Sequence, residues 1–105
     1  MGVDEAVAGF DWDAGNREKC QRHGVSIAEI VDIFAGDPFV APDLKHGHAE
    51  DRFIAVGRDA VGRPVFIAFT IRTKAGRKLI RPVSARYMHR KEAARYEAQS
   101  SQAEN

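Results

Sequence analysis

The sequence is poor in cysteine and has no long hydrophobic run. Its 105 residues include a single cysteine, Cys20, so no disulfide can form within the chain. No apolar stretch approaches the roughly 18 residues that a membrane-spanning helix needs. Residues 1–9 have neither the basic start nor the long apolar segment of a signal peptide. We therefore expect one cytoplasmic domain with a single modest core and no membrane contact.

Basic residues are scarce in one half of the chain and acidic residues in the other. Residues 1–51 contain four Lys or Arg and eleven Asp or Glu, a net charge of −7, whereas residues 52–95 contain twelve and two, a net charge of +10. Nine of those twelve cations are arginine, which binds phosphate through two parallel hydrogen bonds as lysine cannot. This distribution favours a polyanionic partner, most simply a nucleic acid. The alternative is that the cations only keep edge strands from pairing with other chains.

Hydrophobic spacing and capping residues predict two helices in the acidic half. The first is expected over Ala14–His23, with Asp13 as its N-cap. The second is expected over Ser26–Ala35, where Ser26 and Glu29 have the spacing of a capping box. Short strands are expected on either side of the helices, at residues 10–12 and 39–41.

Alternating side chains and turn residues predict an antiparallel sheet in the basic half. Three long strands and a closing helix are expected at 52–58, 64–73, 78–87 and 91–97. Proline cannot donate to a sheet ladder, so Pro82 predicts an edge strand or a bulge. The order of elements predicts one α+β domain over residues 10–97, with both early helices on one face of the sheet and the other face partly open. Residues 1–9 and 98–105 are expected to be flexible tails.

Two arginines on neighbouring strands are predicted to share the open face. Side chains alternate along a strand, so Arg72 lies on the same side as Phe66 and Ala68. With the hairpin turn near Ala75, Arg86 should lie opposite Ala68 or Phe66, about 13 to 20 Å from Arg72 at roughly 3.3 Å per residue. This separation suits successive phosphates of one strand better than a single phosphate.

Several motifs, taken in order, resemble those of one family. Phe10-Asp11-Trp12-Asp13, Asn16, Lys19-Cys20 and Arg22-His23-Gly24-Val25 resemble the amino-terminal signature of the BrnT family of bacterial toxins. The resemblance continues through the segments 46–52, 70–72 and 84–92, and it covers residues 10–97. Arg22 stands where the family usually has lysine, and Gly47 stands where a serine often follows the histidine. Each motif is short, but their order and spacing together are specific.

The resemblance implies a compact RelE-like fold with a sheet of four to five strands. It also implies the toxin of a type II toxin–antitoxin system, a ribonuclease that arrests translation and is neutralised by a BrnA-like antitoxin. That antitoxin would bind DNA as part of the complex, so the toxin's own contact with DNA would be indirect. The residues alone leave a second function open, a non-enzymatic module that binds RNA or a partner protein with the same basic face. We expect the antitoxin to lay an acidic or mixed-charge segment over the face carrying Arg72 and Arg86.

RNA can be cut without a metal when its 2′-hydroxyl attacks the adjacent phosphate. The protein must then stabilise charge on the phosphate, which arginine does, and move protons, which histidine usually does near neutral pH. We place Arg86 on the scissile phosphate, with His46 as the first choice for the proton and His23 as the second. The candidates for catalysis are Arg72, Arg86, His46, His23 and Glu50. The candidates for further RNA contacts are Arg52, Lys19, Arg81 and His89.

Several of these candidates have a structural alternative. His23 would cap the end of its helix, and His89 would begin the last helix. Arg52 would form an exposed ion pair with its acidic neighbour. Glu92 and Tyr96, four residues apart, are expected to dock the last helix rather than to act in catalysis.

The loop His46–Glu50 contains two histidines and a glutamate, which invites a comparison with metal sites. No second pair of ligands follows at a recognised spacing, and Cys20 lies far away in the sequence. We predict neither a metal site nor a cofactor.

Overall fold

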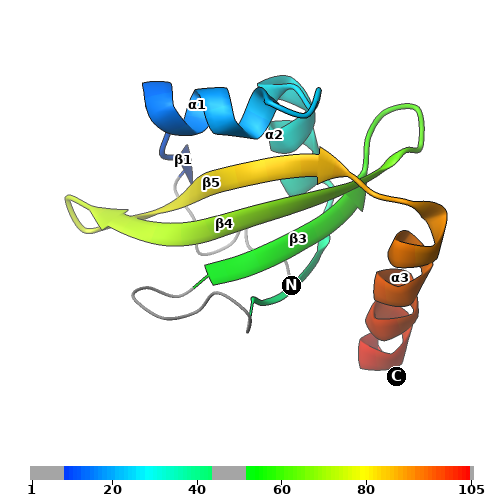
Figure 1. Ribbon diagram of the computed structural model, residues 1–105. Helices are drawn as coiled ribbons and strands as arrows, with labels where there is room; N and C mark the ends of the chain where they lie inside the picture. The colour runs from blue at the N-terminus through cyan, green and yellow to red at the C-terminus, as the bar shows by residue number, and fades with distance from the viewer. Residues whose placement is uncertain (1–8, 44–51, 105) are drawn as a thin grey trace.

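The computed structural model describes the backbone of residues 9–43 and 52–104 (Figure 1). Its elements are β1 (Gly9–Phe10), α1 (Ala14–Gln21), α2 (Ile27–Ala35), β2 (Phe39–Pro42), β3 (Arg52–Arg58), β4 (Pro64–Lys74), β5 (Arg77–Tyr87) and α3 (Arg90–Glu104). This order is the predicted one, although α1 ends before His23 and α3 continues well past the predicted end at residue 97. None of the described helices is both long and apolar enough to cross a membrane.

The five strands form one sheet in the order β1-β5-β4-β3-β2. The pairs β2–β3, β3–β4 and β4–β5 are antiparallel, as predicted. The sheet is nevertheless mixed, because β1 pairs with β5 in parallel. A strand of two residues has too little pattern to reveal its partner, and the long chain between β1 and β5 supplies the crossover that parallel pairing needs.

A tight hairpin joins β4 and β5. Ala75 and Gly76 both have positive φ, 53° and 77°, which is the combination that a two-residue type I′ turn requires. The turn pairs Lys74 with Arg77, and this register continued along β5 would place Arg86 opposite Val65. A bulge further along β5 shifts the pairing by one residue, so Arg86 lies opposite Phe66, one of the two predicted positions. Arg72 lies opposite Leu79, close to the turn.

A β-bulge in β5 accommodates Pro82. Ala68 pairs with Ser84 and Phe69 pairs with Pro82, which leaves Val83 as the extra residue. The short β1 pairs only with the beginning of β5, so β5 is an edge strand at the proline. Both of the conditions predicted for Pro82 are therefore met.

The bulge also changes which side chains of β5 share a face. Arg81 and Arg86 are five residues apart, and in a regular strand an odd spacing would place them on opposite faces. With the extra residue between them, Arg81 lies opposite Thr70 and Arg86 lies opposite Phe66. Thr70 and Phe66 are four residues apart in β4, so both arginines lie on the same face.

Both early helices begin with a capping box. Ser26 and Glu29 form the predicted one in front of α2. Asp13 caps α1 as predicted, and Asn16 completes its box by accepting the N–H of Asp13. The buried amide of Asn16 also donates to the carbonyl of Pro82 at 2.9 Å, which fastens α1 to the free edge of β5.

The main core lies between α1 and α2 and one face of the sheet, the upper face in Figure 1. Phe34 of α2 packs edge-on against Phe69 of β4, with ring centroids 5.0 Å apart. The buried residues of this core are Cys20, Val25, Ile30, Ile33, Phe34, Ala55, Val65, Ile67, Phe69, Ile80 and Ala85.

A smaller core fastens α3 to the opposite face. Tyr96 of α3 packs against Phe39 and Phe66, with ring centroids 6.2 Å from each. Val56, Met88 and Ala93 complete this cluster, and they are all buried. Because α3 covers only one end of this face, the sheet beside it forms the floor of a groove (Figure 1).

Candidate functional site

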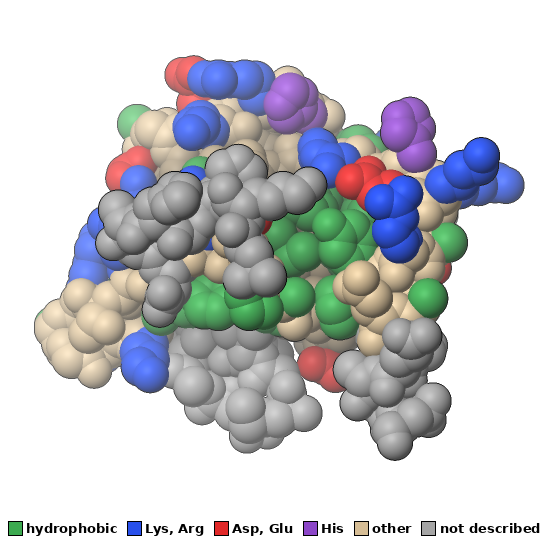
Figure 2. Space-filling view, turned by 60° about the horizontal axis from the view of Figure 1, so that its bottom comes forward, with side chains coloured by type: hydrophobic (Ala, Val, Ile, Leu, Met, Phe, Trp, Pro, Cys, Tyr) green, Lys and Arg blue, Asp and Glu red, His purple; other side chains and the backbone are tan. Residues whose placement is uncertain are grey.

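The groove lies on the face of the sheet that α1 and α2 do not cover. Its floor comes from β3, β4 and β5, and its walls come from the end of β2 and from α3. It has a volume of about 840 Å³. Figure 2, which turns this side toward the reader, shows a hydrophobic patch bordered by cationic and acidic side chains. The lining residues are Ala41, Pro42, Asp43, Arg52, Ile54, Phe66, Ala68, Ser84, Arg86, Glu92, Tyr96 and Gln99.

Arg86 is held in the groove by contacts on two sides. Its Nη1 and Nη2 donate to the two carboxylate oxygens of Glu92 at 3.0 and 2.8 Å. Its guanidinium carbon lies 4.5 Å from the ring centroid of Phe66, within the range of a cation–π contact. The hydrogen bonding between Arg86 and Glu92 raises the pKa of Arg86 and lowers the pKa of Glu92, so both groups are charged at neutral pH.

The same geometry leaves part of the Arg86 guanidinium available. The group has five N–H donors, and Glu92 occupies only its Nη end. No described residue accepts a hydrogen bond from its Nε, and 44% of its side chain is exposed. Arg86 is therefore a cation with a fixed orientation that lines the groove and has donors that no described residue uses.

The docking of α3 gives Arg86 this orientation. Glu92 and Tyr96 lie one turn apart on α3 and reach the sheet together, Glu92 at Arg86 and Tyr96 at Phe66. This confirms that they are docking residues. Glu92 also belongs to the site, because its carboxylate fixes the guanidinium that lies in the groove.

The end of β5 is anchored from the other face by Tyr87. Arg63 stacks on the Tyr87 ring at 4.1 Å and donates to its hydroxyl at 2.9 Å. That hydroxyl in turn donates to Glu29 of α2 at 3.2 Å. Because Tyr87 follows Arg86 directly, this network holds the backbone beside the groove in place.

Arg52 shares the groove with Arg86, whereas Arg72 is not among its lining residues. Arg52 lies opposite Thr70, so its Cα is about 16 Å from that of Arg86 across two strands. Arg72 is about 20 Å from Arg86, at the upper end of the predicted range. The three arginines lie on one face at distances that suit different phosphates of one strand.

The sequence interpretation did not include Ser84 in the site. It lines the groove two residues before Arg86, on the same face of the same strand. That spacing of two was the available signal, because side chains two apart along a strand share a face.

Comparison with known proteins identifies the family. The model of the family described as "Ribonuclease toxin, BrnT, of type II toxin-antitoxin system" matches residues 12–92. The chain belongs to the BrnT family. A search of curated proteins found no significant match. Membership gives the chain the class of a ribonuclease toxin, with RNA as substrate and an antitoxin as partner.

The BrnT match includes most of the groove. Arg52, Ser84, Arg86 and Glu92 all fall inside the matched residues, whereas Tyr96 follows them. The matched region therefore contains the arginines, the carboxylate that orients Arg86, and the floor of the groove.

The structure of this BrnT chain separates one proton-transfer candidate, His23, from Arg86. His23 lies in the turn after α1, on the side of the sheet that the helices cover, whereas Arg86 points to the other side. His46 and Glu50 lie outside the described residues and stay predictions. The described residues next to their segment, Asp43 and Arg52, both line the groove.

His89 has the structural role that was its alternative. It precedes α3, and its carbonyl accepts the N–H of Ala93 at 3.0 Å, as the residue that begins a helix does. The Arg86 hydrogen bond is the main cause of the low pKa of Glu92, and His89 contributes to it through its charge. His89, a candidate from the sequence for RNA contacts and for the proton, thus lies close to the Arg86–Glu92 pair.

Two of the residues assigned to RNA contacts lie elsewhere. Arg81 donates to Asp13 and Asp11, with nitrogen–oxygen distances of 2.9 and 3.4 Å, and only 20% of its side chain is exposed. Asp11 also accepts from Lys74 at 2.9 Å. Arg81 therefore ties the start of α1 to the sheet. Lys19 is exposed on α1, on the other side of the sheet from the groove.

The described residues contain neither a cluster of metal ligands nor an exposed thiol. Among residues 9–43 and 52–104, no group of three or more His, Cys, Asp or Glu is placed to hold a metal ion. Cys20 is buried in the main core, and burial raises the pKa of its thiol to about 11. The thiol is therefore protonated at neutral pH and packs as a small apolar side chain.

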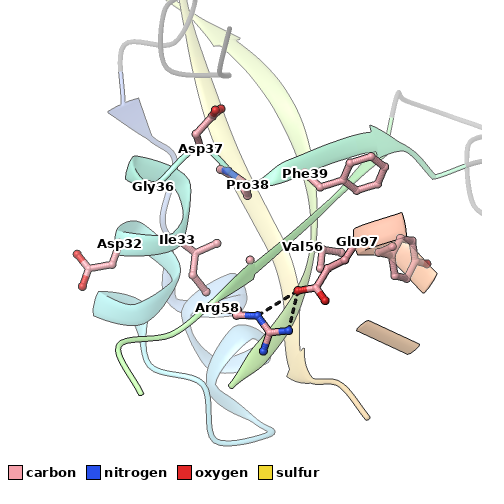
Figure 3. Close-up of a pocket in the computed structure, with 11 residues that line it drawn as sticks. Asp32, Ile33, Gly36, Asp37, Pro38, Phe39, Val56, Arg58 and Glu97 are labelled. Atoms are coloured by element: carbon pink, nitrogen blue, oxygen red, sulfur yellow. Dashed lines mark hydrogen bonds and ion pairs between the residues drawn. The ribbon is translucent and has the colours of Figure 1, made fainter. Parts of the chain in front are cut away.

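A smaller pocket of about 210 Å³ separates the end of α2 from α3. Figure 3 shows Arg58 reaching across it to Glu97, with hydrogen bonds of 3.0 and 2.6 Å to one carboxylate oxygen. Gly57 allows the close approach of α2 here, because a Cβ at this position would lie 2.7 Å from a methyl group of Ile33. The contacts around this pocket help to hold α3 on the sheet.

Proposed function

We propose that this protein is a metal-independent endoribonuclease that cleaves RNA in the cytoplasm and thereby inhibits translation. Membership of the BrnT family supports ribonuclease activity, and the groove supports the location of the active site. The observation that carries the proposal is Arg86, a groove-lining cation that is fixed by Glu92 and Phe66. A preorganised cation of this kind stabilises the charge that develops on a phosphate under attack.

In the proposed reaction the 2′-hydroxyl of RNA attacks its own adjacent phosphate, and the bond from that phosphorus to the 5′-oxygen of the next nucleotide breaks. The products are a 2′,3′-cyclic phosphate and a 5′-hydroxyl. Arg86 contacts the scissile phosphate, and Arg52 and Arg72, which both lie toward the hairpin turn from Arg86, hold the strand further along the same face. Guanidinium groups neutralise the phosphate charge, which is the task that a metal ion performs in metal-dependent nucleases. His46 accepts the proton of the 2′-hydroxyl or donates a proton to the departing 5′-oxygen, solvent water completes the other transfer, and Glu50 orients the imidazole of His46.

We further propose that a BrnA-like antitoxin silences the enzyme by covering the groove. The charge of the chain supports this, because residues 52–95 carry a net charge of +10 and supply most of the groove. An acidic or mixed-charge segment would complement this face and exclude RNA. Contact with DNA would then come through the antitoxin complex alone.

The proposal is tested by incubating purified protein with RNA in the presence of EDTA and mapping the new RNA ends. We expect cleavage that EDTA does not abolish and that the antitoxin suppresses. Cleavage by His46→Ala should fall by about 10² or more, whereas cleavage by His23→Ala should stay close to the parent. Arg86→Lys should cleave at an intermediate rate, because lysine keeps the charge and loses the two-point geometry.

The alternative of a non-enzymatic module makes a different prediction in the same experiment. RNA bound tightly but left intact by folded protein would favour a binding module. Cleavage that stops on addition of EDTA and returns with a divalent metal would contradict metal independence.

A further inference from the structure

Two buried polar atoms on the groove side of the sheet lack a hydrogen-bond partner among the described residues. They are the Nε of Arg52 and the Oγ1 of Thr70. Thr70 is only 2% exposed. Native proteins leave few such atoms without a partner, because burial removes the water that would otherwise bind them. Two such atoms in neighbouring residues mark this place as a candidate site for a ligand or an ordered water.

The two residues are direct neighbours across the sheet. Arg52 begins β3 and lies opposite Thr70 of β4, so their Cβ atoms are about 4.5 to 5.5 Å apart. The next pair on the same face is Ile54 and Ala68, and both of these residues line the groove. Arg52 therefore lines the end of the groove floor, and Thr70, which is not itself a lining residue, lies beside it on the same face.

Both atoms can donate to one anion. The Nε of an arginine is always protonated, and a threonine hydroxyl can turn its proton toward an acceptor. Arg58, Arg81 and Arg86 each form an ion pair with a carboxylate of the chain. Arg52 forms no ion pair with a described residue, in contrast to these three arginines.

We propose that Arg52 and Thr70 form a phosphate-binding subsite that holds the RNA strand away from the cleavage point. This rests on the proposed function, since RNA supplies the phosphate. The subsite lies about 13 Å along the sheet from Arg86, so it takes a different phosphate from the one that Arg86 contacts. A strand held at both points is fixed in position relative to Arg86.

The first test measures binding of an oligonucleotide with 2′-O-methyl riboses, which binds as RNA does and cannot be cut. We expect Arg52→Ala to weaken binding about ten- to a hundredfold. The slope of log affinity against log salt should become less steep by about 0.7, the value for one lost phosphate contact with a single strand. Arg22→Ala is the matched control, because it removes the same charge from the helix-covered side and should leave both quantities unchanged.

The second test replaces Thr70 with valine, which has nearly the same shape and no hydroxyl. Binding should weaken about threefold to tenfold. The midpoint of thermal unfolding should stay level or rise, because an unpartnered buried hydroxyl has been removed. A lower midpoint together with parental binding would show that the hydroxyl serves a buried water in the framework, and would overturn the subsite.

The outcome separates the subsite from the ribonuclease activity. If the parent cuts unmodified RNA while Arg52→Ala and Thr70→Val bind the methylated oligonucleotide as the parent does, the subsite is wrong and the ribonuclease stands. If the parent cuts no RNA while both variants lose binding, the ribonuclease is wrong and the subsite stands. Should Arg52→Ala fail to fold, Arg52→Lys replaces it. An affinity of Arg52→Lys for the methylated oligonucleotide that lies between the affinities of the parent and of Thr70→Val would support the subsite. An affinity equal to that of the parent would contradict it.

Discussion

Arg86 and Arg81 are the same residue type on the same face of the same strand, yet the molecule uses them differently. Arg81 lies between two carboxylates, Asp11 and Asp13, and its side chain is 20% exposed. Arg86 has one carboxylate partner, Glu92, and its side chain is 44% exposed. One end of the sheet face is therefore occupied by the protein's own anions, whereas the other end keeps a cation open to the groove.

The difference teaches that the number and burial of partners decide the role of a cation. Burial alone would lower the pKa of Arg81, but the hydrogen bonds and charges of Asp13 and Asp11 outweigh it and raise the pKa. All of this favourable interaction lies within the fold. The interactions of Arg86 hold its orientation and still leave its Nε edge for a ligand.

The largest expected effect on stability comes from removing a carboxylate at the end of the sheet face where Arg81 is paired. Asp11 is 6% exposed and holds Lys74 and Arg81 together. Asp11→Ala should lower the free energy of unfolding by about 2 to 3 kcal/mol, because it leaves Arg81 partly buried with one partner fewer. Urea unfolding measures this loss. Glu92→Ala should lower the free energy of unfolding by less than about 1 kcal/mol. Equal losses of stability for the two variants would contradict the difference between the surroundings of Arg81 and Arg86.

A smaller effect, on RNA cleavage, is expected from weakening the contact between Glu92 and Arg86 while Arg86 itself is kept. Glu92→Gln keeps the shape of the side chain and removes its charge, so Arg86 loses half of its charge-assisted contact. We expect RNA cleavage to slow by about tenfold while the KM for RNA stays within a factor of about three, since Glu92 positions a group that acts in the transition state. Faster cleavage or tighter RNA binding by Glu92→Gln would show instead that Glu92 competes with phosphate for Arg86.

The smallest effect is a dependence of stability on pH at the occupied end. The hydrogen bond from Lys74 is the main cause that lowers the pKa of Asp11 below its ordinary value of 3.8. A carboxylate with a lowered pKa stabilises the fold at pH values above 3.8, and this contribution is lost as the pH falls through the lower, folded pKa. The parent should therefore lose more stability than Asp11→Asn between pH 5 and pH 2. Parallel curves for the two proteins would exclude a charged Asp11 from the network.

Much of the fold follows from the sequence because its signals are local. The hairpin turn at Ala75 and Gly76 is confirmed, and Arg86 lies opposite Phe66, one of its two predicted positions, because the bulge at Pro82 shifts the register of the turn by one residue. The capping boxes and the antiparallel strands are confirmed as well. The parallel pairing of β1 was missed because a two-residue strand carries no pattern that selects a partner.

The site was less predictable because its decisive contacts are distant in the sequence or depend on an irregularity. Arg81 and Asp11 are 70 residues apart, so nothing in the local sequence marks Arg81 as occupied. The bulge at Pro82 was expected, but its effect in bringing Arg81 and Arg86 to one face needs the register. The unpartnered hydroxyl of Thr70 is visible only once burial is known.

The measurement that tests the central claim most directly compares Arg86→Ala with Arg81→Ala in both RNA cleavage and urea unfolding. Arg86→Ala should lose cleavage by about a hundredfold or more and change the free energy of unfolding by less than about 1 kcal/mol. Arg81→Ala should lose about 2 kcal/mol of stability and, at a temperature where it is folded, cleave within about threefold of the parent. Parental cleavage by folded Arg86→Ala, or loss of cleavage by folded Arg81→Ala, would contradict the account.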